Sequence, residues 1–385
     1  MVALSDYTGR EQSYVKHVFL ERYLERLVHK TASVYPHIVY VDGFAGPWQS
    51  ANERFEDTSF GIALNALRRA KTSWKERGRD VRMSAYLVER NATAYKQLAE
   101  VREKYPDIEI KTYEANFLSV LPTILKDMPA DAFAFFLIDP KGWHIPLKAL
   151  GPMLARLKSE VIFNFMFEFI NRAASIKESA VVAGLNELLP HGNWRSALEA
   201  AGPSSEERKA ILVEAFAANL AHFGKYEYVA ETTVLRPVKD RPLYCLFYAT
   251  RHEKGIEVFR DCQAEALKEQ SKTRAAAKVK HKEAKSGQAE VFQSLHDMGP
   301  DDLTAVQEAE RQTAEQTLLK LAPEAPDSIR YNSLWPQVLA RHIVRRTDVN
   351  QIAARLRREG KLLIPEWEKG KQVPQPHYRI QRVKV

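Results

Sequence analysis

The sequence predicts an α/β fold with a mostly parallel sheet, helices on both faces, an antiparallel hairpin at one edge, and a small separate unit at its C-terminal end. Three observations carry this prediction. Short apolar runs rich in β-forming residues alternate with amphipathic helical stretches from residue 12 to residue 224. Two later apolar runs are joined by a turn that contains proline, which is typical of an antiparallel edge pair. The net charge of +8 falls within residues 331–385, which hold eight Arg and four Lys against three Glu and one Asp.

The composition excludes several classes of protein. A chain of 385 residues predicts two or three domains, and 45% hydrophobic with 28% charged residues is typical of soluble globular proteins. No apolar window of about 18 residues predicts a membrane span. The two cysteines, Cys245 and Cys262, are too few for a disulfide framework or a four-cysteine zinc site, and the histidines lack metal-ligand spacing. The first residues lack the basic and apolar regions of a signal peptide, so we expect a cytoplasmic protein without a bound metal.

The expected elements of the sheet follow one another in a regular order. A helical stripe of apolar side chains predicts a first helix over residues 12–30. Apolar runs that a parallel sheet would bury predict strands within 37–47, 81–91, 108–116, 132–142 and 160–167. The helices between them are expected over 59–78, 92–105, 117–128 and 147–157, and residues 171–224 are expected to be helical with a polar, proline-bearing insertion at 190–207. The antiparallel pair is expected within 227–250.

The remainder of the chain changes character. Residues 253–290 are rich in Ala, Lys, Glu and Gln, which predicts an exposed helix, a linker, or both, and short helices are expected within 291–325. Two helices over 331–342 and 348–362, followed by a strand, a tip and a strand over 361–383, have the layout of a winged helix. We therefore expect three regions: an α/β domain at 1–265, a helical linker at 266–325, and a basic winged helix-turn-helix domain at 326–385.

Glycines and polar residues follow four of the expected parallel strands. They are Asp42, Gly43, Phe44, Ala45 and Gly46 after the first strand, Glu89 after the second, Asn116 after the third, and Asp139 with Pro140 after the fourth. Ligands of open parallel sheets bind outside the carboxyl ends of the strands. A glycine turn lets the backbone approach a ligand, a carboxylate accepts both ribose hydroxyls, and Asn reads an adenine amino group. Each residue alone is equally explained by a turn or a solvated surface, but the set predicts an S-adenosylmethionine site better than a nicotinamide or P-loop site.

Four segments resemble the three-Cys-motif partner protein family, TcmP. They are YVDGFAGP at 40–47, YLVERN at 86–91, FLIDPKGW at 136–143 and YCLFYAT at 244–250. The resemblance covers roughly residues 10–260, and the tail looks like the winged helix-turn-helix found at the end of such proteins. It implies a Rossmann-like S-adenosylmethionine methyltransferase fold and a partner, a radical-SAM-like protein with a three-cysteine motif. Family members read D-P-F/Y-G, which is similar to the motif of a tRNA guanine-N2 methyltransferase group, whereas this chain has Lys141 at the aromatic position.

The residues that follow the fourth and fifth expected strands could serve methyl transfer to an exocyclic amine. The Asp139 carboxylate and the Pro140 carbonyl would accept the amine hydrogens and aim the nitrogen lone pair at the methyl group, so we expect both to be catalytic. An aromatic side chain would stack on the base, for which Trp143, Phe165 and Phe167 are candidates, although strand Phe residues are usually core. Lys141 would meet a phosphate, and Asn164 would contact the substrate or serve a structural role. Lys16 and His17 are weaker candidates for contacts to cofactor or substrate.

The basic tail predicts contact with nucleic acid phosphates. The expected contacts are Arg345, Arg346, Arg355, Arg357 and Arg358 on the two helices and Lys369 and Lys371 on the wing. The first functional interpretation is therefore a methyltransferase that uses S-adenosylmethionine and acts on a base nitrogen of RNA or DNA held by the winged helix. The alternative is a non-catalytic partner subunit of the three-cysteine protein in a nucleic-acid-linked complex, which the Lys141 departure favours. A winged helix also serves as a protein-docking module in some proteins.

Overall fold

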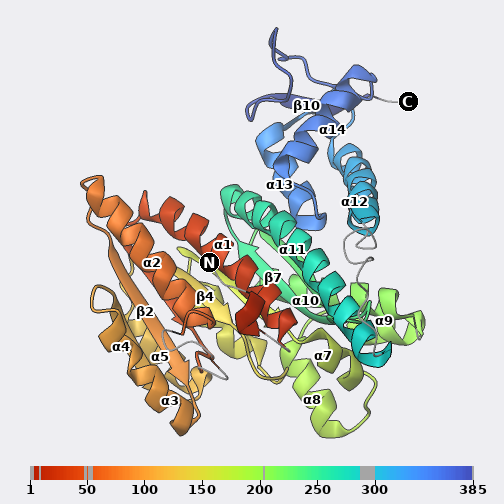
Figure 1. Ribbon diagram of the computed structural model, residues 1–385. Helices are drawn as coiled ribbons and strands as arrows, with labels where there is room; N and C mark the ends of the chain where they lie inside the picture. The colour runs from red at the N-terminus through yellow and green to blue at the C-terminus, as the bar shows by residue number, and fades with distance from the viewer. Residues whose placement is uncertain are drawn as a thin grey trace. The chain divides into compact units, whose positions relative to one another are not determined.

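The computed structural model describes residues 4–7, 10–46, 50, 55–202, 204–286 and 300–383 (Figure 1). The chain divides into two compact units, Met1–Arg251 and His252–Val385. Among the described helices, none combines the length and the apolarity that crossing a membrane requires.

The first unit is built on one seven-stranded sheet. Its strands are β1 (His37–Asp42), β2 (Arg82–Glu89), β3 (Glu109–Glu114), β4 (Phe133–Ile138), β5 (Ser159–Phe165), β6 (Tyr228–Leu235) and β7 (Pro242–Thr250). Their order is β3-β2-β1-β4-β5-β7-β6, in which β1 to β5 are parallel and β7 is antiparallel to both of its neighbours. The order 3-2-1-4-5 is that of a Rossmann-like sheet, whose strand order reverses between β1 and β4. The expected parallel sheet with an antiparallel edge hairpin is confirmed.

Helices cover both faces of this sheet, which explains why every residue of β1, β4 and β5 is buried. The helical elements are η1 (Leu4–Tyr7), α1 (Glu11–Ala32), α2 (Ser59–Glu76), α3 (Ala92–Ala99), α4 (Val101–Lys104), α5 (Phe117–Asp127), η2 (Leu147–Leu150), α6 (Gly151–Leu154), α7 (Phe167–Ala173), α8 (Ser179–Leu188), α9 (Trp194–Ala201) and α10 (Ser205–Gly224). On one face, Tyr23 of α1 packs on Phe135 of β4, with 5.8 Å between ring centroids. On the other, Phe216 of α10 packs on Phe163 of β5, with 4.8 Å between centroids. The region expected to be helical over 171–224 is divided by turns into α7 to α10, and the insertion expected at 190–207 contains the short helix α9.

The second unit combines helices with a small sheet. Its elements are α11 (Glu253–Ser286), α12 (Pro300–Leu321), β8 (Ile329–Arg330), α13 (Tyr331–Arg341), α14 (Arg346–Arg358), β9 (Leu362–Leu363) and β10 (Arg379–Arg382). The three strands form an antiparallel sheet in the order β8-β10-β9. The helices α13 and α14 match the two predicted from the tail sequence. The short helices expected within 291–325 are replaced, in the part described, by the single helix α12, and residues 287–299 lie outside the described residues.

The division between the units differs from the expected boundaries. The expected break between residues 265 and 266 falls inside α11, and the chain divides after Arg251 instead. The start of α11 contacts α13, where the Arg260 guanidinium donates to the Leu339 carbonyl at 2.7 Å. Within the stretch expected as a linker, Arg311 of α12 pairs with Asp348 of α14 at 2.9 Å, so α12 packs with the tail in one compact unit. Each unit also contains one buried free cysteine, Cys245 in β7 and Cys262 in α11.

Candidate functional site

A cavity of about 870 Å³ opens at the carboxyl ends of the parallel strands in the first unit. Because β3, β2, β1 and β4 are neighbours, the polar residues that follow them meet at one edge of the sheet. Seven residues singled out from the sequence line this cavity: Gly43, Phe44, Glu89, Asn116, Pro140, Lys141 and Trp143. Five others do not belong to its described lining: Asp42, Ala45, Gly46, Asp139 and Asn164.

The glycine turn after β1 is held against the sheet by backbone hydrogen bonds. The Gly43 amide donates to the Leu137 carbonyl at 3.2 Å, and the Ala45 amide donates to the Val88 carbonyl at 2.8 Å. A Cβ atom at residue 43 would lie only 2.9 Å from Cγ of Phe117. The absence of a side chain therefore lets the Phe117 ring, the first residue of α5, close one wall of the cavity.

A substitution at this turn should be costly. Gly43→Ala is expected to destabilise the first unit by about 1–3 kcal/mol, because the added methyl group must displace the Phe117 ring in a packed wall. Thermal unfolding of the full chain measures the loss. Gly151→Ala is the matched control, because its nearest neighbour would be Phe223 at 4.0 Å, an ordinary contact. Equal stability of the two variants would contradict the role given to Gly43.

Asp42 supports the turn from beneath and does not face the cavity. The carboxylate is fully buried and accepts hydrogen bonds from the Phe44 amide at 3.0 Å, the Tyr40 hydroxyl at 3.0 Å and the Ser59 hydroxyl at 2.7 Å. Burial raises the pKa of Asp42 to about 6, against the opposing effect of these three donors. Asp42 therefore positions the glycine turn and does not contact a ligand in the cavity directly.

Glu89 and Asn116 do reach the cavity. One oxygen of the Glu89 carboxylate, Oε1, accepts from the Asn91 amide at 2.6 Å, and its side chain is only 4% exposed. The Asn116 side-chain oxygen accepts from the Leu118 amide at 3.0 Å and so caps the first turn of α5. One side-chain oxygen of each residue is thus already hydrogen-bonded to a nearby backbone amide. The second carboxylate oxygen of Glu89 and the amide nitrogen of Asn116 make no hydrogen bond to other described residues.

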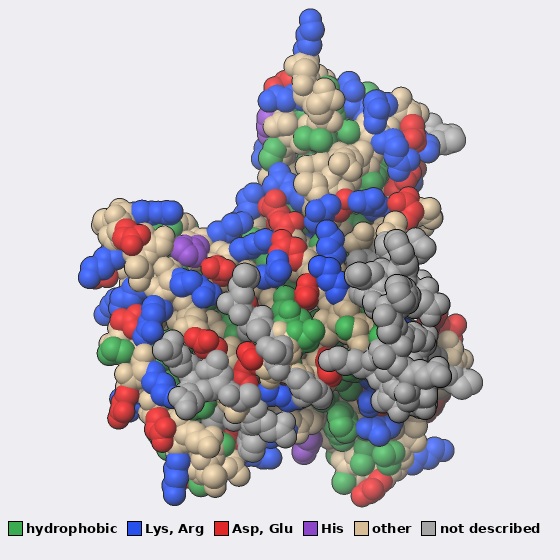
Figure 2. Space-filling view, in the orientation of Figure 1, with side chains coloured by type: hydrophobic (Ala, Val, Ile, Leu, Met, Phe, Trp, Pro, Cys, Tyr) green, Lys and Arg blue, Asp and Glu red, His purple; other side chains and the backbone are tan. Residues whose placement is uncertain are grey.

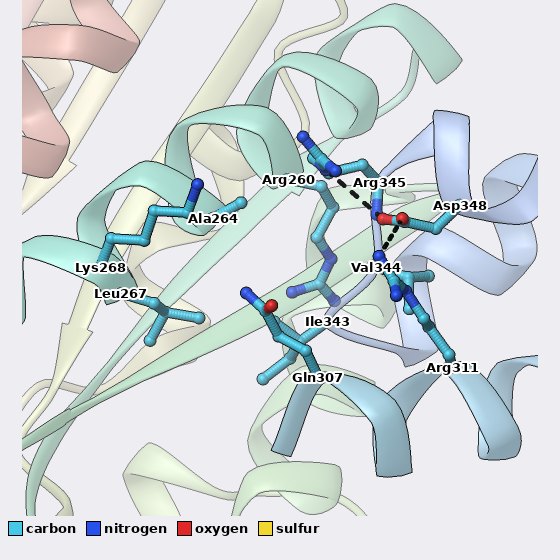
Figure 3. A pocket seen from close by; sticks show the side chains of 10 residues that line it. All are labelled: Arg260, Ala264, Leu267, Lys268, Gln307, Arg311, Ile343, Val344, Arg345 and Asp348. Atoms are coloured by element: carbon cyan, nitrogen blue, oxygen red, sulfur yellow. Dashed lines mark hydrogen bonds and ion pairs between the residues drawn. The ribbon is translucent and has the colours of Figure 1, made fainter. Parts of the chain in front are cut away.

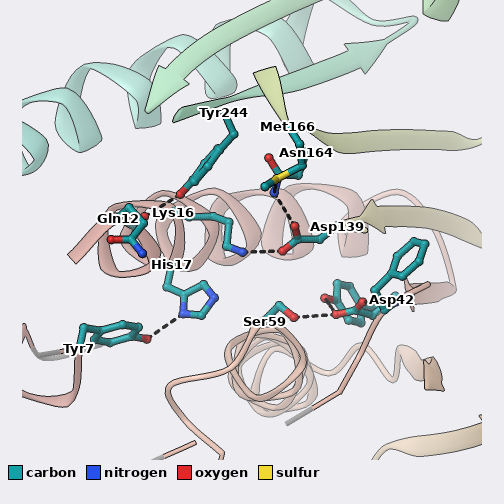
Figure 4. Close-up of polar contacts among 12 residues, drawn as sticks. Tyr7, Gln12, Lys16, His17, Asp42, Ser59, Asp139, Asn164, Met166 and Tyr244 are labelled. Carbon is teal, nitrogen blue, oxygen red and sulfur yellow. Dashed lines mark hydrogen bonds and ion pairs between the residues drawn. The ribbon is translucent and has the colours of Figure 1, made fainter. Parts of the chain in front are cut away.

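Asp139, the predicted catalytic acid, lies beside a different and much smaller cavity of about 10 Å³. Its carboxylate forms an ion pair with the Lys16 ammonium at 2.5 Å and accepts from the Asn164 amide nitrogen at 2.5 Å (Figure 4). Burial alone would raise the pKa of Asp139, but the charge and hydrogen bond of Lys16, with the hydrogen bond of Asn164, lower it below its usual value. Asp139 and Asn164 are therefore hydrogen-bonded to each other, and side chains of α1 line the small cavity beside them.

A second polar contact fixes this end of α1. Nδ1 of the buried His17 ring and the Tyr7 hydroxyl are hydrogen-bonded at 2.8 Å (Figure 4). Burial, reinforced by the neighbouring Lys16 charge, lowers the pKa of His17 to about 3, so the ring is neutral near pH 7. His17 therefore helps to position the helix that carries Lys16 and contacts η1 rather than the strand-end cavity.

The aromatic candidates separate into core and cavity residues. Phe165 is fully buried and Phe167 is 5% exposed, so both belong to the core. Trp143 lines the cavity, and so does Phe169, which is 43% exposed and was not among the predicted residues. The expected fifth strand extends through residue 167, whereas β5 ends at Phe165 and α7 begins at Phe167. The first turn of α7 presents Phe169 to the cavity, and the signal that could have identified it is an aromatic residue four positions beyond the end of β5.

The basic residues predicted on the tail are largely paired within the second unit. Arg345 pairs with Asp348, Arg346 with Glu257, Arg355 with Glu315 and Glu359, and Lys371 with Glu368. Arg346 also stacks on the Trp335 ring at 4.6 Å, and Arg357 stacks on the Trp367 ring at 4.3 Å. Arg358 and Lys369 are exposed and make no ion pair to any described residue. On the face drawn in Figure 2, Lys and Arg side chains are interspersed with Asp and Glu side chains.

No family model and no curated protein matches this chain. Several solved structures are similar to it at low identity. A Legionella pneumophila protein of the family DUF519 is 13% identical, over 62% of this chain and 85% of its own, with a TM-score of 0.36. TYW2 of M. jannaschii, solved with AdoMet, is 12% identical over 58% of this chain and 73% of its own, with a TM-score of 0.28. An O-methyltransferase of Bacillus cereus, solved with SAH, is 12% identical over 60% and 80%, with a TM-score of 0.29.

Because these TM-scores are low, we assign the fold of the chain from its own strand order. Within the described ranges, no group of three or more His, Cys, Asp and Glu side chains is arranged to hold a metal ion. The donors at the strand-end cavity are instead a carboxylate, a carboxamide, a lysine and backbone amides, surrounded by aromatic and aliphatic walls. Such a lining suits an organic ligand with hydroxyl groups and a planar ring.

Proposed function

We propose that the first unit binds S-adenosylmethionine in the strand-end cavity and transfers its methyl group to a base nitrogen of a nucleic acid. The observation that carries this proposal is the convergence of the glycine turn, Glu89 and Asn116 on one cavity at neighbouring strand ends. The donor set fits the cofactor. Glu89 keeps one carboxylate oxygen for ribose hydroxyls, Asn116 keeps an amide nitrogen for a ring acceptor, and Phe117 with Leu118 offers apolar walls for a base.

The acceptor is proposed to enter beside Pro140. When bound, S-adenosylmethionine supplies an electrophilic methyl group. The Pro140 carbonyl accepts one hydrogen of the incoming amine, and Trp143 and Phe169 pack against the base. Lys141 lies near the Glu89 charge at the mouth, where its ammonium would meet a phosphate. Asp139 serves as the second acceptor for the amine only after Lys16 gives way, because the Lys16 ammonium now holds that carboxylate.

The second unit is proposed to be a winged helix that holds the nucleic acid. Its two helices followed by short antiparallel strands support this, and Arg358 and Lys369 are the exposed cations that would contact phosphates. Arg358→Glu and Lys369→Glu should each weaken binding of a duplex and reduce the slope of log affinity against log salt by about 0.9 per lost contact. Unfolding of the chain should not change, because exposed unpaired charges contribute little to stability. An unchanged salt slope, measured by fluorescence anisotropy, would favour a protein-docking role for this unit.

One specific observation favours the alternative, a non-catalytic partner subunit of a radical-SAM-like three-cysteine protein. The ion pair between Lys16 and Asp139 occupies the group that the resemblance makes catalytic, and Lys141 replaces the family aromatic. In that case the cavity binds the cofactor for a structural purpose, or binds nothing.

Calorimetry with S-adenosylmethionine and transfer of tritium from its labelled methyl group to RNA and DNA test the proposal together. The methyltransferase should bind the cofactor and label one of the two polymers. Asp139→Asn should keep cofactor binding, since Asp139 lies outside the cavity lining, and lose transfer. Cofactor binding without transfer in either protein would move the function to the partner subunit. The absence of binding at millimolar cofactor would contradict the methyltransferase outright.

A further inference from the structure

The second unit contains a small cavity of about 70 Å³ that none of the proposed steps uses (Figure 3). Three helices meet around it. Arg260 and Lys268 come from α11, Gln307 and Arg311 come from α12, and Arg345 and Asp348 come from the start of α14. Its polar lining therefore holds four cationic side chains, one carboxylate and one carboxamide.

Two of the cations share the single carboxylate. The Asp348 side chain accepts from Arg311 at 2.9 Å and from the Arg345 guanidinium at 3.4 Å, and it also accepts from the Arg345 backbone amide at 2.8 Å. Arg311 also pairs at 3.8 Å with Glu308, which does not line the cavity, and the Glu310 carboxylate acts on the Arg260 charge. Lys268, in contrast, forms no ion pair with a described residue.

The other two cations differ in their settings. Arg260 is only 3% exposed, and its guanidinium is fixed by the Leu339 carbonyl at 2.7 Å and the Ala340 carbonyl at 3.3 Å. Its charge is therefore held in place at the wall. Lys268 is exposed, and neither its ammonium nor the Gln307 carboxamide forms a hydrogen bond with another described residue. Figure 3 shows Arg260 and Gln307 reaching from facing helices toward the same central space.

We infer that this cavity, defined by Arg260, Lys268, Gln307, Arg311 and Arg345, is a binding site for a phosphate group. Its volume of about 70 Å³ is well below the roughly 300–1,000 Å³ of pockets that hold drug-sized ligands, so it suits a small oxyanion better than a nucleoside. An oxyanion would place negative charge beside Lys268 and accept charge-assisted hydrogen bonds from guanidinium groups, which match its geometry. The group is either free phosphate or a phosphate carried by a nucleic acid, and the site does not depend on the cofactor cavity of the first unit.

Titration of the full chain with inorganic phosphate, followed by calorimetry at low ionic strength, tests the inference. Lys268→Glu and Gln307→Glu each bring a carboxylate to the lining without removing a described hydrogen bond or ion pair. Each should weaken phosphate binding by about tenfold or more, because a like charge now faces the anion. Lys272→Glu is the matched control, since Lys272 lies one turn further along α11, is 70% exposed and does not line the cavity.

Short oligonucleotides with and without a 5′-phosphate, used as competitors, identify the source of the group. Competition that needs the 5′-phosphate indicates a monoester, competition by both indicates the backbone diester, and competition by neither leaves free phosphate as the ligand. Each of these results supports the site when the two lining variants are weakened and the control is not. The inference is overturned if the unmodified protein gives no heat with phosphate, or if all three variants bind it as the unmodified protein does.

Discussion

Replacing Glu89 with alanine should weaken binding of S-adenosylmethionine by about 10- to 100-fold, measured by calorimetry on the full chain. The loss of hydrogen bonds to a charged acceptor costs about 1.5–3 kcal/mol, and each 1.4 kcal/mol is tenfold in affinity. The carboxylate lines the cavity, and only one of its oxygens is engaged, by the Asn91 amide. Its other oxygen is the acceptor that the ribose hydroxyls of the cofactor would use.

Two further variants separate this loss from damage to the fold. Glu89→Gln keeps a carbonyl oxygen for the Asn91 amide and should still bind weakly, because it lacks the negative charge. Glu114→Ala removes an exposed carboxylate from the end of the adjacent strand β3, outside the cavity lining, and should bind normally. Unchanged affinity in Glu89→Ala would place the ribose elsewhere.

Lys16→Met should destabilise the first unit by about 2–3 kcal/mol. Removing one partner of a buried ion pair costs about 3–5 kcal/mol, and the remaining exposure of these two side chains, 17% and 19%, reduces the loss. The reason is that in the variant the largely buried Asp139 carboxylate no longer has a cation beside it. The double variant Lys16→Met with Asp139→Asn should recover part of the loss, since no unpaired charge remains. Lys30→Met, an exposed position on the same helix, should change stability by less than about 0.5 kcal/mol.

The same pair predicts a dependence on pH. Because the folded pKa of Asp139 lies below its usual value, the unfolded chain binds its proton first as the solution is acidified. The contribution of the pair is complete above the unfolded pKa of about 4 and disappears as pH falls through the lowered folded pKa. The difference in unfolding free energy between Lys16→Met and the unmodified protein should therefore shrink as the solution is acidified, because protonation first neutralises the unpaired Asp139 of the folded variant and then breaks the pair in the unmodified protein. A difference that stays constant down to pH 2 would contradict the pairing.

The sheet was predictable because its strands correspond to recognisable apolar runs in the sequence. The runs that became β1, β4 and β5 are buried on both faces, so they read as uninterrupted apolar segments rather than alternating ones. The hairpin of β6 and β7 was marked by its Pro-containing turn. Once the order of parallel strands is known, the meeting of Gly43, Glu89 and Asn116 at one edge follows, since strand ends converge whatever the helices between them do.

The closure of Asp139 could not be predicted in the same way. Lys16 lies 123 residues earlier in the chain and pairs with Asp139 only because α1 packs across the sheet. A lysine on an amphipathic helix normally points to solvent, so the position of Lys16 in the helical pattern does not predict its contact with Asp139. Phe169 was not predicted because the expected fifth strand extends to residue 167, whereas β5 ends at Phe165 and α7 begins at Phe167.

The placement of the two cysteines, one in each compact unit, provides a pair of internal reporters. Cys245 and Cys262 are both buried, and burial raises the pKa of the Cys245 thiol, which keeps it protonated and unreactive in the folded unit. A thiol becomes open to alkylation only when the structure around it opens. Brief alkylation at increasing denaturant, with the two cysteine peptides quantified by mass spectrometry, would therefore follow the unfolding of Met1–Arg251 and of His252–Val385 separately in one unlabelled chain.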